Sequence, residues 1–190
     1  MRFRECAVPE GTRLAAFQLD APHLAAAAVE ADLPGTVPIT APQLARAAMA
    51  RPNLVPERLQ AFGDALTAIQ GVIFKPFGVV PNTHRRNKEL PELVVGDRFG
   101  PWQVYSIEDH EVVLGDTDPF WDFRVSFLVT EPVARLGVVL RARNKPGELY
   151  YRLMRRMQQR MLRDSLQRGL ETLTAAAGAA APPVQPRGAR

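Results

Sequence analysis

The sequence predicts an α+β fold, in which an antiparallel sheet is packed by N-terminal helices and by one long C-terminal helix. Three observations support this class. Residues 40–75 show the apolar spacing of helices, residues 94–144 alternate apolar and polar residues as strands do, and a helical pattern returns after residue 146. Helices and strands that are segregated along the chain in this way are typical of α+β proteins.

Length and composition favour one domain with irregular ends. The chain has 190 residues, of which 46% are hydrophobic and 23% charged, as in ordinary globular proteins. We expect an irregular N-terminal segment over residues 1–23, a single α+β domain over 24–174 and a disordered Ala/Pro/Gly-rich tail over 175–190. A first strand is expected at 24–33, with helix as the alternative because alanine is a poor strand former.

Two helices are expected before the sheet. In "TAPQLARAAMA", Thr40 is a good N-cap, Gln43 stands three residues later as in a capping box, and Pro42 lies in the first turn. A second helix is expected over residues 55–76, followed by a polar loop at 81–92. The apolar face of that second helix consists of Leu59, Phe62, Leu66, Ile69 and Ile73.

The clearest strand lies at residues 121–129. Trp121, Phe123, Val125, Phe127 and Val129 share one face, and the residues between them share the other. Two strands joined by a turn at Asp109-His110 are expected before this strand, and one over 134–144 after it. On the polar face, we expect Asp122 to pair with Arg141 or Arg143. Asp116 and Asp118 precede Pro119 and are typical of turn residues.

The terminal helix, expected from about 146 to 174, has two unlike faces. Its apolar stripe consists of Leu149, Tyr150, Leu153, Met154, Met157 and Met161. A later stripe, formed by Leu162, Leu166, Leu170 and Leu173, lies on another side of the helix. We therefore expect the helix either to bend near residues 161–165 or to meet another partner with its second half.

The ring-rich strand face and the apolar stripe together suggest a binding site. Core packing is the simplest interpretation, and the functional alternative is a cavity that holds a small apolar ligand, since methionine and aromatic rings suit an adaptable apolar site. The predicted ligand-binding residues are Trp121, Phe123, Phe127, Tyr150, Met154 and Met157.

The arginine face of the helix suggests a second kind of contact. Residues 145–168 hold seven basic and two acidic residues, so the net charge of +4 is concentrated there. This face is a solvated surface or a contact for an anion or an acidic protein partner, and we expect carboxylates from outside residues 145–170, such as Glu89 or Glu92, to meet part of it. The residues concerned are Arg152, Arg155, Arg156 and Arg160, together with Arg163.

The sequence argues against several other functions. The three histidines, His23, His84 and His110, are far apart in the sequence, and Cys6 is the only cysteine. We therefore expect no metal site, no cofactor and no catalytic constellation. No nucleic-acid-binding module is recognisable. No segment is long enough to span a bilayer and no secretory signal is seen, so a cytoplasmic protein is expected, and the Arg-, Ala- and Pro-rich composition is typical of a GC-rich bacterial genome.

Three blocks of sequence resemble a known family. These are "ITAPQLARAAMARP", "VGDRFGPWQVYSIEDHEVVLGDTDPFWDFRVSFLV" and "LRARNKPGELYYRLMRRMQQRMLRDSLQR". Together they are similar to the domain-of-unknown-function 2867 family over about residues 25–170. The resemblance implies a small bacterial protein, sometimes attached to a short-chain-dehydrogenase-like partner. It also implies similarity to the helix-grip (Bet v 1/START-like) class, in which a curved sheet wraps a C-terminal helix. The resemblance supplies no catalytic residues to carry over to this chain.

Two functions therefore remain open, and an enzymatic function ranks third because no acid–base pair is visible. The first is a binding protein that holds a small apolar ligand between the sheet and the C-terminal helix. The second is a ligand-free interaction module, a homo-oligomer or the subunit of a partner, that uses the stripe formed by Leu162, Leu166, Leu170 and Leu173.

Overall fold

The computed structural model describes residues 2–20, 22, 25–33, 38–50, 92–100, 102–117 and 120–180. Within the last range, the side chains of residues 146, 150, 153–157 and 180 are not part of the description. The helix expected over 55–76 lies outside the described residues, and so does nearly all of the loop expected over 81–92.

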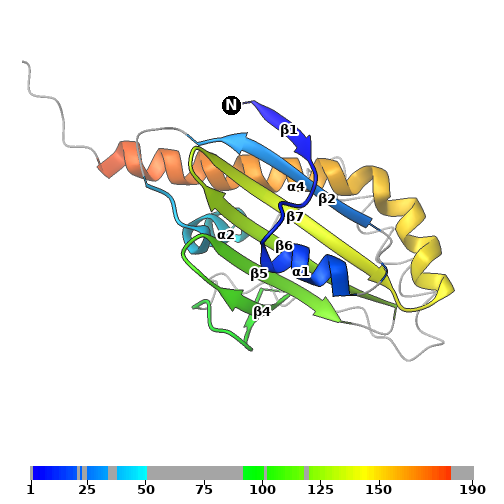
Figure 1. Cartoon of the computed structure of the whole chain (residues 1–190). Coiled ribbons are helices and arrows are strands. Elements are labelled where there is room, and N and C mark those ends of the chain that lie inside the picture. The colour runs from blue at the N-terminus through cyan, green and yellow to red at the C-terminus, as the bar shows by residue number, and fades with distance from the viewer. Residues whose placement is uncertain are drawn as a thin grey trace, which may run out of the picture.

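The described residues form one antiparallel sheet and three helices, so the predicted α+β class is confirmed (Figure 1). The strand order across the sheet is β1-β2-β7-β6-β5-β4-β3, and every pairing is antiparallel. The strands are β1 (Phe3–Cys6), β2 (Ala25–Asp32), β3 (Arg98–Phe99), β4 (Trp102–Ile107), β5 (Glu111–Thr117), β6 (Trp121–Thr130) and β7 (Val133–Ala142). The helices are α1 (Arg13–Asp20), α2 (Ala41–Met49) and α4 (Lys145–Ala180).

The two faces of the sheet are covered by different helices. Figure 1 shows α1 on one face, with α2 and α4 on the other. The alternation predicted for β6 matches this arrangement. Val125 and Phe127 pair with Val138 and Leu136 of β7 and join the core beneath α2 and α4. Ser126, between them, faces α1 and contacts Glu111. The period-two pattern is therefore that of a central strand with both faces covered.

The first helix of the α2–α4 face begins as its sequence predicts. Gln43 donates its backbone N–H to the Thr40 hydroxyl over 3.4 Å, and Thr40 donates its own N–H to the Gln43 side chain over 2.9 Å. This capping box satisfies two of the N–H groups that a helix start leaves without partners. The helix is thereby held in place, and it packs its buried leucine and alanine side chains onto the core.

The N-terminal segment differs from the expectation of an irregular stretch over residues 1–23. It contains β1, which pairs with β2 from Phe3↔Ala31 to Cys6↔Ala28, and α1, which begins after the N-cap Thr12. Four residues without an apolar run carry almost no strand signal of their own, so pairing with β2 is what makes this segment a strand. The other short strand that was not expected, β3, is likewise defined by its partner, β4.

The C-terminal helix is longer than expected and is not straight. Asn144 caps its first turn by accepting the Gly147 N–H at its side-chain oxygen, over 2.9 Å, and the helix continues to Ala180 rather than ending near 174. Figure 1 shows a clear angle between its yellow first turns and its orange remainder. Leu162, Leu166 and Leu170 are buried against α2 and the sheet, so this stripe is covered by the chain itself.

The polar face of β6 is organised by α1, and the predicted pair between Asp122 and Arg141 is wrong. The two residues lie opposite each other in the β6–β7 register, but Asp122 accepts hydrogen bonds from Arg124 and from the Thr117 hydroxyl. The Arg141 guanidinium instead donates to the Phe17 carbonyl and lies 3.6 Å from the centre of the Phe17 ring. Because the expectation did not include α1, it lacked the group that attracts Arg141.

Candidate ligand-binding cavity

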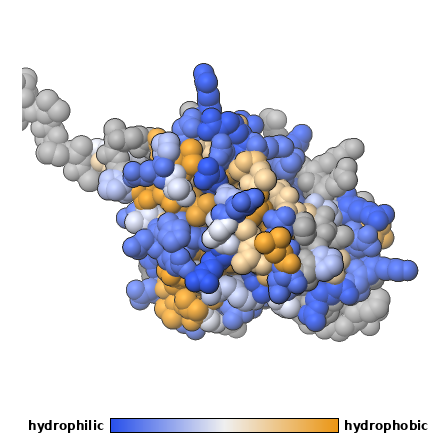
Figure 2. Space-filling model, in the orientation of Figure 1, coloured by the Kyte–Doolittle hydropathy of each residue, from blue (hydrophilic) through white to orange (hydrophobic). Residues whose placement is uncertain are grey.

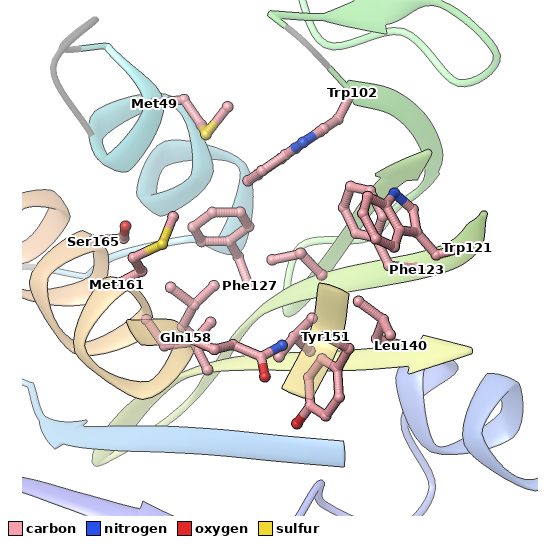
Figure 3. Close-up of a pocket in the computed structure, with 14 residues that line it drawn as sticks. Met49, Trp102, Trp121, Phe123, Phe127, Leu140, Tyr151, Gln158, Met161 and Ser165 are labelled. Carbon is pink, nitrogen blue, oxygen red and sulfur yellow. The ribbon is translucent and has the colours of Figure 1, made fainter. Parts of the chain in front are cut away.

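A cavity of about 300 Å³ lies between the sheet and the helices α2 and α4 (Figure 3). Its floor is the apolar face of β6 and β7, and α2, β4 and α4 supply its sides. The described residues that line it are Met49, Trp102, Trp121, Phe123, Val125, Phe127, Leu136, Val138, Leu140, Tyr151, Gln158, Met161, Leu162 and Ser165. The volume lies at the lower end of the range of about 300–1,000 Å³ that is typical of small-molecule sites.

Three of the predicted ligand-binding residues lie together on the sheet wall of this cavity. Trp121, Phe123 and Phe127 come from alternate positions of β6, and their rings stand over the same face of the sheet (Figure 3). Phe127 is almost fully buried, at 1% exposure, whereas Trp121 and Phe123 are only partly buried. The wall therefore passes from packed core at Phe127 to a more open end at Trp121.

The Trp102 ring of β4 completes this wall, and no local pattern in the sequence predicts it. Its ring meets that of Phe123 edge to face, with the centroids 5.9 Å apart and the planes at 81°. Such pairs are among the favoured arrangements of aromatic rings. The strand was expected, but nothing near Trp102 in the sequence signals which β6 ring it meets. Both tryptophans of the chain, Trp102 and Trp121, thus line the cavity.

The helical wall comes from α4. The side chains of the predicted residues Tyr150, Met154 and Met157 lie outside the description, so their role stays a prediction. Among the described residues, α4 contributes Met161 and Leu162 and a line of three polar side chains, Tyr151, Gln158 and Ser165. These three are spaced seven residues apart, which is close to two helical turns, so they share one side of the helix. The seven-residue spacing of these polar residues is a pattern in the sequence that could have predicted their common side of α4.

The cavity is electrically neutral along its described lining. No Asp, Glu, Lys or Arg side chain belongs to that lining, and the polar atoms come from the two indoles and from the three α4 side chains. A hydrogen bond inside such an apolar site is stronger than in water, and an unpaired charge is much more costly. The site is thus suited to hold and orient an uncharged molecule.

The arginine face of α4 does not meet the predicted carboxylates in the part that can be described. Arg152 pairs over 3.0 Å with Glu148 on its own helix, and the Arg163 guanidinium lies 5.2 Å from the centre of the Phe3 ring. Arg160 is exposed. For these three, the described residues supply no carboxylate from outside 145–170 within ion-pair distance. The side chains of Arg155 and Arg156 lie outside the description, as does Glu89.

Cys6 does not have the surroundings of an activated thiol. Partial burial raises the pKa of its thiol, and the nearby carboxylate of Glu30 raises it further. The reactive form of cysteine is the thiolate, which a raised pKa disfavours at neutral pH. The lone cysteine therefore lacks the activation that a nucleophile requires.

Among the residues that the structure describes, the most buried charged one joins an element to the other face of the sheet. Glu111 is 1% exposed, and its carboxylate accepts hydrogen bonds from the backbone N–H groups of Arg13 (2.8 Å) and Leu14 (3.3 Å) and from the Ser126 hydroxyl (2.7 Å). A carboxylate at a helix N-terminus meets both free N–H groups and the positive end of the helix dipole. Glu111 thus attaches α1 to β5 and β6.

These features define an α+β protein with an apolar cavity between its sheet and its C-terminal helix. Residues 26–164 match the family described as "Protein of unknown function (DUF2867)", and the chain belongs to this family, as its sequence blocks predicted. No curated protein and no solved structure matches the chain, so the likeness to the helix-grip class stays a prediction. None of the helices in the described part of the chain combines the length and the hydrophobicity that a bilayer crossing requires.

Proposed function

We propose that this protein binds a small apolar molecule in the cavity between β6, β7 and α4. The observation that carries the proposal is the cavity itself, a space of about 300 Å³ whose described walls are almost entirely aromatic, aliphatic and thioether side chains. Removing an apolar molecule from water contributes about 25 cal/mol for each Å² of its surface that is buried, and rings and thioethers adapt to its shape.

The size of the cavity supports a ligand rather than a packing defect. Protein interiors contain few voids larger than a water molecule, and an engineered apolar cavity of roughly 150 Å³ is enough to bind benzene. The present cavity is about twice that volume. An apolar ligand that fills this space would give the lining atoms additional dispersion contacts.

The observation that motivated the alternative function, a ligand-free interaction module, no longer supports it. That observation was a leucine stripe on α4 without a partner, and Leu162, Leu166 and Leu170 are buried inside the chain. Contact with an acidic partner remains a prediction for four residues of the arginine face, Arg152, Arg155, Arg156 and Arg160. Such a contact is compatible with ligand binding, because these arginines are not among the described residues that line the cavity.

A neutral fluorescent probe tests the proposed function. N-phenyl-1-naphthylamine becomes fluorescent in apolar surroundings and accepts energy from tryptophan. Because Trp102 and Trp121 are the only tryptophans and both line the cavity, we expect saturable energy transfer when the probe is added. An absence of saturable transfer would overturn the proposal.

Two leucine-to-phenylalanine variants locate the probe. Leu140→Phe places a larger side chain into the cavity, and we expect it to weaken probe binding at least about fivefold. Leu19→Phe is the matched control, because Leu19 is 86% exposed on α1, on the other face of the sheet. Equal affinity of the two variants would show that the probe binds elsewhere and would contradict the proposal.

A further inference from the structure

The distribution of polar groups around the cavity restricts the class of ligand that it takes. The sheet wall and α2 present aliphatic side chains, rings and a thioether, whereas the polar side chains other than the two indoles all come from α4. A molecule in the cavity therefore meets an apolar surface on one side and hydrogen-bonding groups on the other. This asymmetry calls for a ligand that is itself two-sided.

Gln158 is the polar group best placed to bind such a ligand. Its side chain extends from α4 with the amide on the side of Tyr151 (Figure 3). Within the described part of the chain, its amide has no hydrogen-bond partner, whereas the neighbouring Gln159 donates to Glu5 over 3.0 Å and the Ser165 hydroxyl accepts from Arg168 over 3.3 Å. An amide offers both a donor and an acceptor, so it can bind a hydroxyl or a carbonyl group.

The lining also restricts the charge of the ligand. An ionised group that leaves water needs an opposite charge or several hydrogen bonds, and the described lining supplies no charged side chain. The charged side chains of β6, Asp122 and Arg124, belong to the opposite face of the sheet, where they pair with each other. A carboxylate or ammonium group on the ligand would therefore lose its hydration without compensation.

The shape of the apolar wall favours a ring system. Trp102 and Phe123 meet edge to face, and Trp121 and Phe127 extend the same ring-lined surface along β6. Aromatic rings bind other rings in offset or edge-to-face arrangements that contribute beyond the buried area alone. A cavity of about twice the volume that holds benzene has room for two fused rings.

We infer that the cavity takes an uncharged, ring-containing molecule with a hydroxyl or carbonyl group on its edge, which the amide of Gln158 binds while the rings lie against Trp102, Trp121 and Phe123. This inference rests on the proposed function and specifies the ligand class of the same site.

Three probes with the same ring system test the inference at about pH 7, where a phenol is neutral and a carboxylic acid is ionised. They are naphthalene, 2-naphthol and 2-naphthoate. Binding is followed by NMR through the two indole N–H signals of a ¹⁵N-labelled protein, because both indoles line the cavity. We expect 2-naphthol to bind about five- to tenfold more tightly than naphthalene, as one net hydrogen bond implies, and 2-naphthoate to bind at least about tenfold more weakly than 2-naphthol.

Two variants assign the hydrogen bond. In Gln158→Leu, which keeps the size of the side chain but removes the amide, the preference for 2-naphthol over naphthalene should fall to about one. Gln159→Leu is the matched control, because Gln159 is exposed and bonded to Glu5, and it should keep the preference. A preference that survives in Gln158→Leu, or 2-naphthoate binding as tightly as 2-naphthol, would overturn the inference.

Failure of this inference is distinguishable from failure of the proposed function. If N-phenyl-1-naphthylamine binds in the cavity but the three naphthalene probes show none of the expected differences, the inference on ligand class is wrong and the proposed function stands. If neither that probe nor the naphthalene series binds, both are wrong.

Discussion

Glu111 shows how much a single residue contributes to this fold. It is a carboxylate in the interior, and the structure compensates for its burial with two backbone N–H groups of α1 and one hydroxyl of β6. These three donors are buried or part-buried, so each would lack a hydrogen-bond acceptor without Glu111, just as the Glu111 carboxylate would lack donors without them. The residue therefore joins the N-terminal helix to the sheet.

Replacing Glu111 by alanine should lower the free energy of unfolding by about 3 kcal/mol or more. The substitution leaves several donors without an acceptor, and each buried unsatisfied group costs about 1–3 kcal/mol. Urea denaturation monitored by circular dichroism measures the change. The matched control is Glu108→Ala. Glu108 forms a more exposed ion pair with Arg13 and lies 3.3 Å from the His110 imidazole, so its loss should cost about 1 kcal/mol or less. Equal losses for the two variants would contradict the role assigned to Glu111.

At the scale of elements, the contact between α2 and α4 decides how closely the two helices approach each other. Gly169 of α4 faces Leu44 and Ala48 of α2, and a Cβ atom at position 169 would stand 3.0 Å from the Leu44 Cδ1 atom and 3.2 Å from the Ala48 Cβ atom. These distances are shorter than ordinary contacts, so the glycine permits the close packing that buries Leu166 and Leu170 on either side. This packing also fixes the rotation of α4, and thereby which of its residues face the cavity.

Gly169→Val should reduce the free energy of unfolding by about 2 kcal/mol, because an overpacked interface forces the helices apart. Thermal or urea denaturation gives the value. Gly178→Val is the control in the same helix, since a Cβ atom there meets nothing within 4 Å, and its effect should stay within about 0.5 kcal/mol. The assigned packing would be refuted if the two valine variants were equally stable. If Gly169→Val folds, it should also bind N-phenyl-1-naphthylamine more weakly than Gly178→Val.

At the scale of the whole molecule, segments far apart in the sequence cover the two faces of one sheet. The N-terminal α1 packs on the face opposite α4 at Gly137, where a Cβ atom would stand 2.8 Å from the Leu14 side chain. On the side that carries α1, Figure 2 shows hydrophobic groups interrupted by hydrophilic residues. Hydrophobic residues scattered in this way are normal for the surface of a globular protein.

The purified protein should be a monomer of 21.0 kDa, because the leucine stripe that would have needed a partner is buried by α2 and the sheet of the same chain. Size-exclusion chromatography with light scattering measures the mass. A stable dimer would contradict this prediction and would restore the interaction module as the better account of α4. Measurement at two ionic strengths separates association through the arginine face, which salt weakens, from apolar association.

Local patterns in the sequence were sufficient to predict several parts of this protein. The alternation from Trp121 to Val129, the capping box of Thr40 and Gln43, and the long terminal helix all depend on residues close together in the chain. Periodicity determines which side chains share a face, so the ring-bearing wall formed by Trp121, Phe123 and Phe127 could be predicted before any tertiary contact was known.

Only the tertiary structure decided what lies opposite that wall. Trp102 meets Phe123 because β4 and β6 flank β5 in the sheet, so that their side chains can meet over it. Gln158 and Ser165 line the cavity because the packing of α4 on α2 sets the rotation of α4. Likewise, β1 is a strand because it pairs with β2. The burial of the Glu111 carboxylate is stabilised because the start of α1 donates backbone N–H groups to it. These features depend on partners that are distant in the sequence, and a local pattern contains no information about which distant groups will meet it.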